Sequence, residues 1–231
     1  MCLFMCNFAR SEYIQILLKY TLSKVIAWCT FNYMNDTKVI LLGNTDVGKT
    51  CIATRMDSQL YTDNINSTVG GSKFKINRII DNIHVEFSLW DTAGQEKYRA
   101  LAPIYIRDAN LILVVFDLTS QSSFDAIEEW VELARNALDV APEIVLIGNK
   151  YDLSEKIKIT PGQMNQKQEE IGATTAVQVS AKTNYGIESL ILTIHNILKE
   201  QSNKLTTSNK SSIGGSKLFT NGSQKTDGCC V

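Results

Sequence analysis

Apolar and polar positions recur along this chain with two different periods, which predict strands interleaved with helices. Three short apolar runs are typical of buried strands: residues 38–42, 111–116 and 144–148. Residues 83–89 alternate strictly, which predicts a strand whose apolar residues share one face. One segment repeats apolar residues at helical spacing: Phe124, Ile127, Val131, Ala134 and Leu138. Together these patterns predict an α/β domain with a doubly wound sheet.

The first apolar run leads through a glycine-containing loop into a helical pattern. The loop and the start of the helix read Gly43-Asn44-Thr45-Asp46-Val47-Gly48-Lys49-Thr50-Cys51. Two glycines let the backbone turn tightly, so that successive N–H groups and a helix N-terminus converge on phosphate oxygens. We expect Lys49 to reach the β- and γ-phosphates and the Thr50 hydroxyl to ligate Mg²⁺. A chance glycine turn is the alternative, and the flanking strand and helix argue against it.

Two further segments indicate which base the nucleotide carries. Residues 144–148 deliver Asn149-Lys150-Tyr151-Asp152 to the carboxyl end of a strand, where open α/β sheets bind ligands. The Asp152 carboxylate only accepts hydrogen bonds, so it suits the N1–H and N2–H₂ donors of guanine. Ser180-Ala181-Lys182 follows a short strand at 176–179 and could place the Ala181 N–H on guanine O6. Either segment alone could be an ordinary turn, but their order in the chain favours GTP over ATP.

A third polar segment, residues 90–99, follows the alternating strand and carries candidate hydrolysis chemistry. We expect Asp91 to hold Mg²⁺ through water, the Gly94 N–H to sense the γ-phosphate and Gln95 to orient the attacking water. A solvated loop that happens to contain Asp and Gln is the alternative.

With these motifs, residues 37–198 and the C-terminal cysteines resemble the Rab family of the Ras superfamily of small GTPases. The resemblance implies the small-GTPase P-loop fold, a mostly parallel six-stranded sheet with helices on both faces. It implies a Mg²⁺-dependent switch in vesicle traffic that binds GTP or GDP and hydrolyses GTP slowly without an activating protein. A non-trafficking Ras-type signalling GTPase and a weakly hydrolysing GTP-binding adaptor are the alternatives.

The resemblance also assigns roles in the segment between the phosphate loop and the alternating strand. Thr68, which lies 18 residues after Thr50 (68 − 50), resembles the switch I threonine that closes on Mg²⁺ and the γ-phosphate. Tyr61 occupies the place of an aromatic residue that packs on the guanine edge, or else is simply a loop aromatic. The implied catalytic set is therefore Lys49, Thr68, Gly94 and Gln95, and the implied metal set is Thr50, Thr68 and Asp91.

Partners implied by the resemblance are an exchange factor, a GTPase-activating protein, effectors, a prenylation escort and a GDP-dissociation inhibitor. Residues 90–105 resemble the early-endosomal subgroup most. Two positions depart from it. Lys73 stands where those proteins carry Phe, with Phe74 one place later, so the aromatic effector patch is altered or shifted in register. Thr45 replaces a smaller residue beside the γ-phosphate, which leaves the intrinsic hydrolysis rate open.

Composition agrees with this interpretation. The 231 residues are 44% apolar and 20% charged, which suits one α/β domain with tails. A net charge of −1 gives no reason to expect nucleic-acid binding. The six cysteines form no CxxC pair, so we predict neither a zinc site nor a disulfide framework.

Both ends of the chain are expected to lie outside the domain. Residues 199–231 are rich in Ser, Thr, Asn, Gly and Lys, which predicts a flexible tail. A C-a-a-X signal needs Cys fourth from the end, and Gly228 stands there, so that signal is not encoded. The adjacent pair Cys229 and Cys230 instead resembles a double geranylgeranylation signal. We therefore expect prenylation and residence on the cytoplasmic face of an intracellular membrane, the endosome among the candidates, with cycling through the cytosol. Residues 1–36 are interpreted as an amphipathic membrane helix or, preferentially, as the product of a start codon misassigned upstream of Met34.

Overall fold

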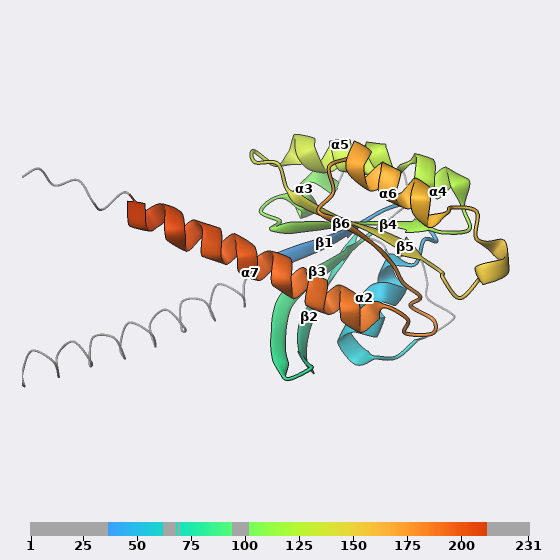
Figure 1. Ribbon diagram of the computed structural model, residues 1–231, viewed down its shortest axis with the longest axis horizontal. Coiled ribbons are helices and arrows are strands. Elements are labelled where there is room, and N and C mark those ends of the chain that lie inside the picture. The colour runs from blue at the N-terminus through green and yellow to red at the C-terminus, as the bar shows by residue number, and fades with distance from the viewer. Residues whose placement is uncertain (1–36, 62–67, 69, 94–101, 212–231) are drawn as a thin grey trace, which may run out of the picture.

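A single six-stranded sheet organises the chain (Figure 1). The computed structural model describes residues 37–61, 68, 70–93 and 102–211. The strands, in the spatial order β2-β3-β1-β4-β5-β6, are β2 Gly71–Ile80, β3 Ile83–Thr92, β1 Lys38–Leu42, β4 Leu111–Asp117, β5 Glu143–Asn149 and β6 Thr175–Gln178. β2 pairs with β3 antiparallel, and the other four strand pairs of this sheet are parallel. The predicted α/β fold with a mostly parallel six-stranded sheet is therefore confirmed.

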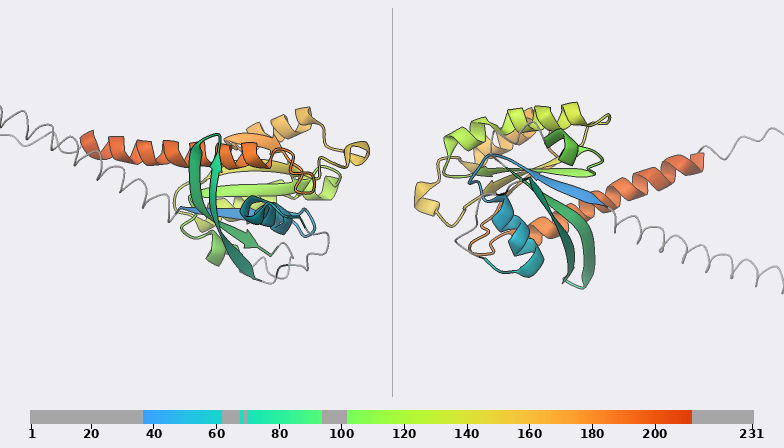
Figure 2. Two further views of the ribbon diagram at one scale, coloured as in Figure 1. Left: turned by 90° about the horizontal axis from the view of Figure 1, so that it is seen from below. Right: turned by 180° about the vertical axis from the view of Figure 1, so that it is seen from behind.

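Helices cover both faces of the sheet (Figure 2). One face is covered by α2 Lys49–Ser58 and α7 Ile187–Ser211, which share one hydrophobic cluster with the sheet. The other is covered by α3 Ala102–Ile106, α4 Gln121–Asp125, α5 Ile127–Ala137 and α6 Pro161–Glu170. A short 3₁₀ helix, η2 Ser154–Lys156, precedes α6. Because both faces are covered, β1 and β4 are near-continuous runs of buried apolar residues.

The alternating strand at 83–89 forms as predicted, but two of its three polar side chains are buried. Val85, Phe87 and Leu89 belong to the cluster shared with α2 and α7, as their period requires. Glu86 and Ser88, on the opposite face of β3, are buried as well. The Glu86 carboxylate pairs with the Lys75 ammonium of β2 at 2.8 Å. Such pairing is what permits a charge to be buried.

The helical pattern from Phe124 to Leu138 is divided between two helices. α4 ends at Asp125 and α5 begins at Ile127, with Ala126 between them. The backbone bond from Trp130 N to Ala126 O is long, 3.4 Å, at this junction. The apolar period continues across the break because both helices pack on the same cluster.

Helix α7 extends beyond the boundary that composition predicts. We expected a flexible tail from Lys199, whereas α7 continues to Ser211. Leu198 is buried, and the Gln201 side-chain amide donates to Asn110 O at 3.1 Å, so packing continues past the predicted boundary. An existing helix gains one hydrogen bond per residue added, so polar residues without Gly or Pro can prolong it. None of the helices in the described part of the chain is both long enough and apolar enough to span a bilayer.

His195 is the most buried titratable side chain of α7. It is 9% exposed, and among the described residues its Nδ1 has no hydrogen-bond partner. Burial lowers the pKa of His195, and the nearby charges of Lys199 and His84 lower it further. A histidine with a depressed pKa in the folded state takes up its proton more readily when the chain unfolds. This residue therefore makes stability fall as the pH drops below the unfolded value of about 6.5.

The first prediction follows from this burial. The His195→Leu variant should lose less stability than the wild type between pH 7.5 and pH 5.5, because it has no buried imidazole to protonate. The urea midpoint of the nucleotide-bound protein measures this difference. His84→Gln is the matched control, since His84 is exposed and is the other histidine of the chain. Parallel pH profiles for the wild type and His195→Leu would contradict the prediction.

Candidate functional site

Candidate residues from distant parts of the sequence meet at one edge of the sheet. The phosphate loop follows β1, Asp91 lies near the end of β3, and Asn149 ends β5. Ser180 and Ala181 follow β6. Parallel strands place their carboxyl ends at a common edge, which is where α/β sheets bind ligands. The topology therefore gathers segments more than 130 residues apart (180 − 43) around one site.

The two glycines of the phosphate loop are required by close approach. A Cβ on Gly43 would lie 2.2 Å from Val115 O, and one on Gly48 would lie 2.4 Å from Asn149 Nδ2. Both also have positive φ, +144° and +93°, which side chains rarely adopt. α2 begins directly after Gly48, so the N–H groups of its first turn face the loop. This is the arrangement that the loop sequence predicts for phosphate oxygens.

The Lys49 ammonium is held over the loop. Its Nζ donates to Gly43 O at 2.8 Å and to Asn44 O at 2.7 Å. Burial lowers the pKa of Lys49 to about 8, against the opposing charges of Asp91 and Asp46. These two bonds fix the position of the side chain, and a phosphate would supply the negative charge that its burial demands.

Thr50, Thr68 and Asp91 form a compact cluster of oxygen atoms. Thr50 Oγ1 lies 2.8 Å from Thr68 Oγ1, and both hydroxyls donate to Asp91 Oδ2, at 2.7 and 3.1 Å respectively. Asp91 Oδ1 is buried and has no partner within the described part of the chain. Burial raises the pKa of the Asp91 carboxyl, while the Thr50 hydrogen bond, the Lys49 charge and the Thr68 hydrogen bond oppose the shift.

The chemistry of this cluster fits Mg²⁺. The ion prefers hard oxygen ligands in an octahedron at about 2.0–2.1 Å and usually keeps several waters and substrate phosphates. Two hydroxyls and one carboxylate with an unused oxygen supply part of such a shell, directly or through water. A cation would also satisfy the buried Asp91 Oδ1, whose desolvation no hydrogen bond among the described residues compensates.

On the base side, Asn149 and Ser180 join the two candidate guanine segments. The Asn149 side-chain amide donates to Val47 O at 2.8 Å, and its Oδ1 accepts from the Ala181 N–H at 3.2 Å. Ser180 Oγ donates to Asp152 Oδ1 at 2.6 Å. The Ala181 N–H, expected on guanine O6, thus already has an acceptor, and a base at this site would have to share or replace that bond.

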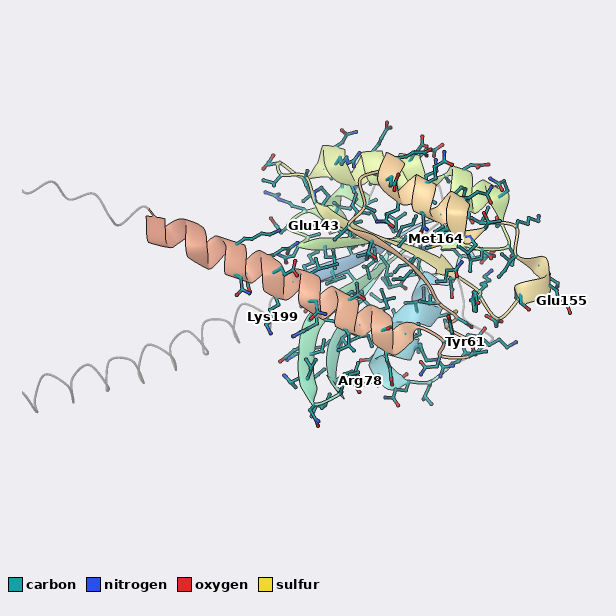
Figure 3. All side chains as sticks on the ribbon, in the orientation of Figure 1. Tyr61, Arg78, Glu143, Glu155, Met164 and Lys199 are labelled. Carbon is teal, nitrogen blue, oxygen red and sulfur yellow. The ribbon has the colours of Figure 1, made fainter. Side chains whose placement is uncertain are left out.

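Lys150 and Tyr61 lie at the margins of the base segments. Lys150 has φ +66° and pairs with Asp117 at 2.8 Å, so a residue at the end of β4 that the sequence did not single out fixes its ammonium. Figure 3 shows Tyr61 beside the loop that leads into α7. The Arg55 guanidinium lies 5.6 Å from the Tyr61 ring centroid.

Arg55 is a site-supporting residue that sequence reasoning missed. Its Nε donates to Ala181 O at 2.8 Å and its Nη2 donates to Lys182 O at 2.7 Å. The guanidinium therefore ties α2, the Tyr61 ring and the Ser180–Lys182 segment together. A cation–π pair at a partly exposed site is typically worth about 0.5–1 kcal/mol. The sequence contains no signal for this role of Arg55, because Arg55 and Ala181 are 126 residues apart (181 − 55).

A second missed contact anchors the phosphate loop. Trp130 Nε1 on α5 donates to Asn44 Oδ1 at 2.7 Å. The neighbouring Thr45 Oγ1 is buried and has no hydrogen-bond partner among the described residues. Thr45 therefore retains an unused hydroxyl inside the loop, where a phosphate oxygen could accept from it.

Lys73 replaces an aromatic residue on the exposed face of β2, and Phe74 does not take its place there. Lys73 lies opposite Trp90 in the β2–β3 register, with its Nζ 5.6 Å from the Trp90 ring centroid. The Lys38 ammonium lies 4.8 Å from the same centroid. Phe74 lies opposite Leu89 and packs against the cluster shared with α2 and α7. Of the two expectations, alteration of the patch therefore fits better than a shift of the aromatic along it.

Several predicted residues lie outside the described part of the chain. They are Gly94, Gln95, Cys229, Cys230 and the N-terminal extension at 1–36. Their roles stay predictions.

Comparison with known proteins agrees with this geometry. The Ras family profile matches residues 38–200. The Ras-related protein RabJ of Dictyostelium discoideum is 35% identical over 159 residues, which span 69% of this chain and 62% of RabJ. Ras-related protein Rab-8B of Bos taurus is 32% identical over 200 residues, spanning 85% of this chain and 95% of Rab-8B. Rab-8B of Homo sapiens is 31% identical over the same length. These matches do not favour a non-trafficking or non-hydrolysing alternative, and they leave the early-endosomal subgroup a prediction.

The second prediction concerns base choice. Asp152→Asn should weaken GDP binding by at least about tenfold, because hydrogen bonds to a charged group are worth about 1.5–3 kcal/mol and the amide presents a donor to guanine donors. The variant should gain affinity for xanthosine diphosphate. Asn can still accept from Ser180, so the loop contact survives. Calorimetric titration of both nucleotides measures the change, with the exposed Asp125→Asn as control. Equal GDP affinity for Asp152→Asn and wild type would contradict the assignment.

Proposed function

The chain belongs to the Ras family of small GTPases, with Rab proteins among its relatives, and we propose that the site at the carboxyl edge of its sheet makes it a GTP-hydrolysing switch in vesicle traffic. GTP and GDP are its ligands, and hydrolysis of GTP to GDP and phosphate is its reaction. The phosphate loop from Gly43 to Thr50 holds the phosphates, and Asp152 with Ala181 selects guanine.

The observation that carries this proposal is the cluster formed by Thr50, Thr68 and Asp91. Its three residues come from a helix start, the segment before β2 and the end of β3, and their oxygens lie within 3.1 Å of one another as measured above. Mg²⁺, when bound, neutralises charge that develops on the β- and γ-phosphate oxygens. Lys49 adds a fixed positive charge on the phosphate side, and Thr68 is placed to report whether the metal and the γ-phosphate are present.

Gly70, two residues after Thr68, is joined to the end of β3 by hydrogen bonds. The Ala93 N–H donates to Gly70 O at 2.9 Å, and Gly71 pairs with Thr92 at the start of β2. Thr92 Oγ1 donates to Leu41 O at 2.6 Å, which ties the end of β3 to β1. Thr68 binds Asp91 of β3 through its hydroxyl, so a change at Thr68 would act on the end of β3, where β2 begins its pairing and partners would read it.

Effectors that bind beside β2 would meet a positive surface. We call the group Lys38, Lys73 and Trp90 the Trp90 surface. Its two ammonium groups flank one indole ring, as the distances above show. Acidic effectors suit it better than the partners of a GTPase with Phe at position 73. An exchange factor, an activating protein, a prenylation escort and a GDP-dissociation inhibitor complete the proposed partners.

Membrane attachment is assigned to the C-terminus. Cys229 and Cys230 would each carry a geranylgeranyl chain and hold the GTPase on the cytoplasmic face of an intracellular membrane, endosomal membranes included. One lipid chain gives marginal binding at roughly 0.8 kcal/mol per buried CH₂, whereas two give stable anchoring. Helix α7 continues to Ser211, so 17 residues (228 − 211) separate the domain's last helix from the first lipidated cysteine, Cys229.

The third prediction separates nucleotide binding from turnover. Gln95→Leu should slow activator-stimulated hydrolysis roughly 100-fold, because an attacking water that is no longer positioned loses about that factor, while GTP affinity is retained. Thr50→Asn should instead weaken Mg²⁺·GTP more than GDP, since it removes a metal ligand. Single-turnover hydrolysis and nucleotide titration measure the two effects.

Thr54→Asn, one turn further along α2, is the matched control for Thr50→Asn. Hydrolysis by Gln95→Leu at the wild-type rate with an activating protein present would remove Gln95 from the mechanism. A Thr50→Asn variant that keeps wild-type Mg²⁺·GTP affinity would show that the Thr50–Thr68–Asp91 cluster is not the metal site.

The fourth prediction concerns the anchor. Replacing both Cys229 and Cys230 with Ser should release the protein from membranes, and replacing one should leave a weakly held, mislocalised protein. Membrane fractionation and imaging of a tagged protein measure this. The double variant is tested with and without residues 1–33. Retention of the full-length double variant, with release on deleting 1–33, would assign anchoring to the N-terminal segment instead.

A further inference from the structure

Two tyrosines stack against each other between the segments that carry the guanine-binding groups. Tyr151 lies between Lys150 and Asp152, and Tyr185 lies in the loop before α7. Their ring centroids are 4.6 Å apart with an interplanar angle of 16°. Tyr151 is partly buried against the cluster under α4, α5 and α6, whereas Tyr185 is 52% exposed. The Tyr151 ring is thus anchored in the core, whereas the Tyr185 ring is held mainly by its contact with Tyr151.

Backbone hydrogen bonds hold both tyrosines, Tyr151 to the opposite segment and Tyr185 to Ser180 within its own loop. The Tyr151 N–H donates to Val179 O at 3.1 Å, and the Ser180 N–H donates to Tyr185 O at 3.0 Å. Ser180 Oγ in turn donates to Asp152 Oδ1. A closed ring of contacts therefore runs from Asp152 through Ser180 and Tyr185 to Tyr151, which is the covalent neighbour of Asp152.

Both tyrosines follow a non-glycine residue with positive φ. Lys150 has φ +66° and Asn184 has φ +67°, so each tyrosine is preceded by a non-glycine residue in the left-handed region. Gly186, after Tyr185, has φ +71°, and a Cβ there would lie 2.7 Å from Gln178 O. The Tyr151–Tyr185 stack and the Ser180–Asp152 hydrogen bond are both side-chain contacts between the two loops that contain these turns.

We propose that Tyr151 and Tyr185 are positioning residues that fix Asp152 and the Ala181 N–H relative to each other and so set both guanine selectivity and the lifetime of bound nucleotide. The inference rests on the proposed GTP site and deepens it. Asp152 reads the exocyclic amino group and N1–H of guanine, whereas Ala181 lies on the O6 side. Their spacing therefore has to match one base, and the stack packs the two loops against each other at the aromatic rings.

The experiment compares removal of the ring with removal of its hydroxyl. Tyr185→Leu deletes the aromatic ring, and Tyr185→Phe is the matched control that keeps the stack. The readouts, on the full-length protein with Mg²⁺, are the dissociation rate of a fluorescent GDP and the ratio of GDP to IDP affinity. Inosine lacks the amino group that Asp152 accepts from, so the ratio reports the placement of Asp152 and does not follow general stability.

For Tyr185→Leu we expect GDP release to accelerate about threefold to tenfold, the range that loss of one aromatic pair supports, and the GDP to IDP ratio to fall by a similar factor. Tyr185→Phe should match the wild type in both. Tyr151→Leu should reproduce the effect from the other side, and the double Leu variant should add little to either single one. Tyr185→Met replaces Tyr185→Leu if the latter does not fold.

Three results would overturn the proposal. The first is a Tyr185→Leu variant with an unchanged release rate and affinity ratio. The second is faster release with an unchanged ratio, which would indicate general loosening. The third is a Tyr185→Phe variant as impaired as Tyr185→Leu, which would assign the effect to the hydroxyl. If the wild type itself does not prefer GDP to IDP, the guanine site fails with it. If Asp152→Asn loses that preference and Tyr185→Leu keeps it, only the positioning role fails.

Discussion

The buried side chain of Asn149 is the contact on which the geometry of the whole site depends. It is 2% exposed, and its carboxamide joins the phosphate loop through Val47 O to the base segment through the Ala181 N–H. Gly48 passes so close to Asn149 Nδ2 that a side chain at position 48 would clash. Leaving one of these buried polar groups without its partner costs about 1–3 kcal/mol. One residue at the end of β5 thus holds the phosphate and base halves of the site in register.

Two groups of residues lie on either side of Asn149, one on the phosphate side and one on the base side of the site. On the phosphate side, Thr50, Thr68 and Asp91 share one buried carboxylate whose second oxygen still lacks a partner among the described residues. On the base side, Asp152, Ser180 and the two stacked tyrosines form a closed ring of contacts. The phosphate side is adjacent to β2 and the Trp90 surface, so in the proposed switch it is the half of the site that would pass the state of the bound nucleotide to the sheet edge.

Much of the fold was predictable because its signals are local. The apolar runs at 38–42 and 144–148 match β1 and the centre of β5, since strands covered on both faces must be continuously apolar. The end of α7 at Ser211 could not be predicted from composition. Composition identifies segments that cannot form a core, whereas a packed helix can continue through polar residues beyond its last buried position. The burial of Glu86 was hidden for a related reason. Alternation assigns a face to each residue but does not say what covers that face.

For the site, the sequence by itself was enough to predict which residues carry phosphate, metal and guanine chemistry, because those roles need particular functional groups at fixed spacing along a strand, a turn and a helix. Only the tertiary structure decided which residues hold them in place. Arg55 beneath Ala181, Trp130 on Asn44, Asp117 on Lys150 and Tyr185 on Tyr151 each pair across 33 to 126 positions. Such contacts depend on how the strands are ordered in the sheet. The sequence alone does not give the distances between residues that lie far apart along the chain.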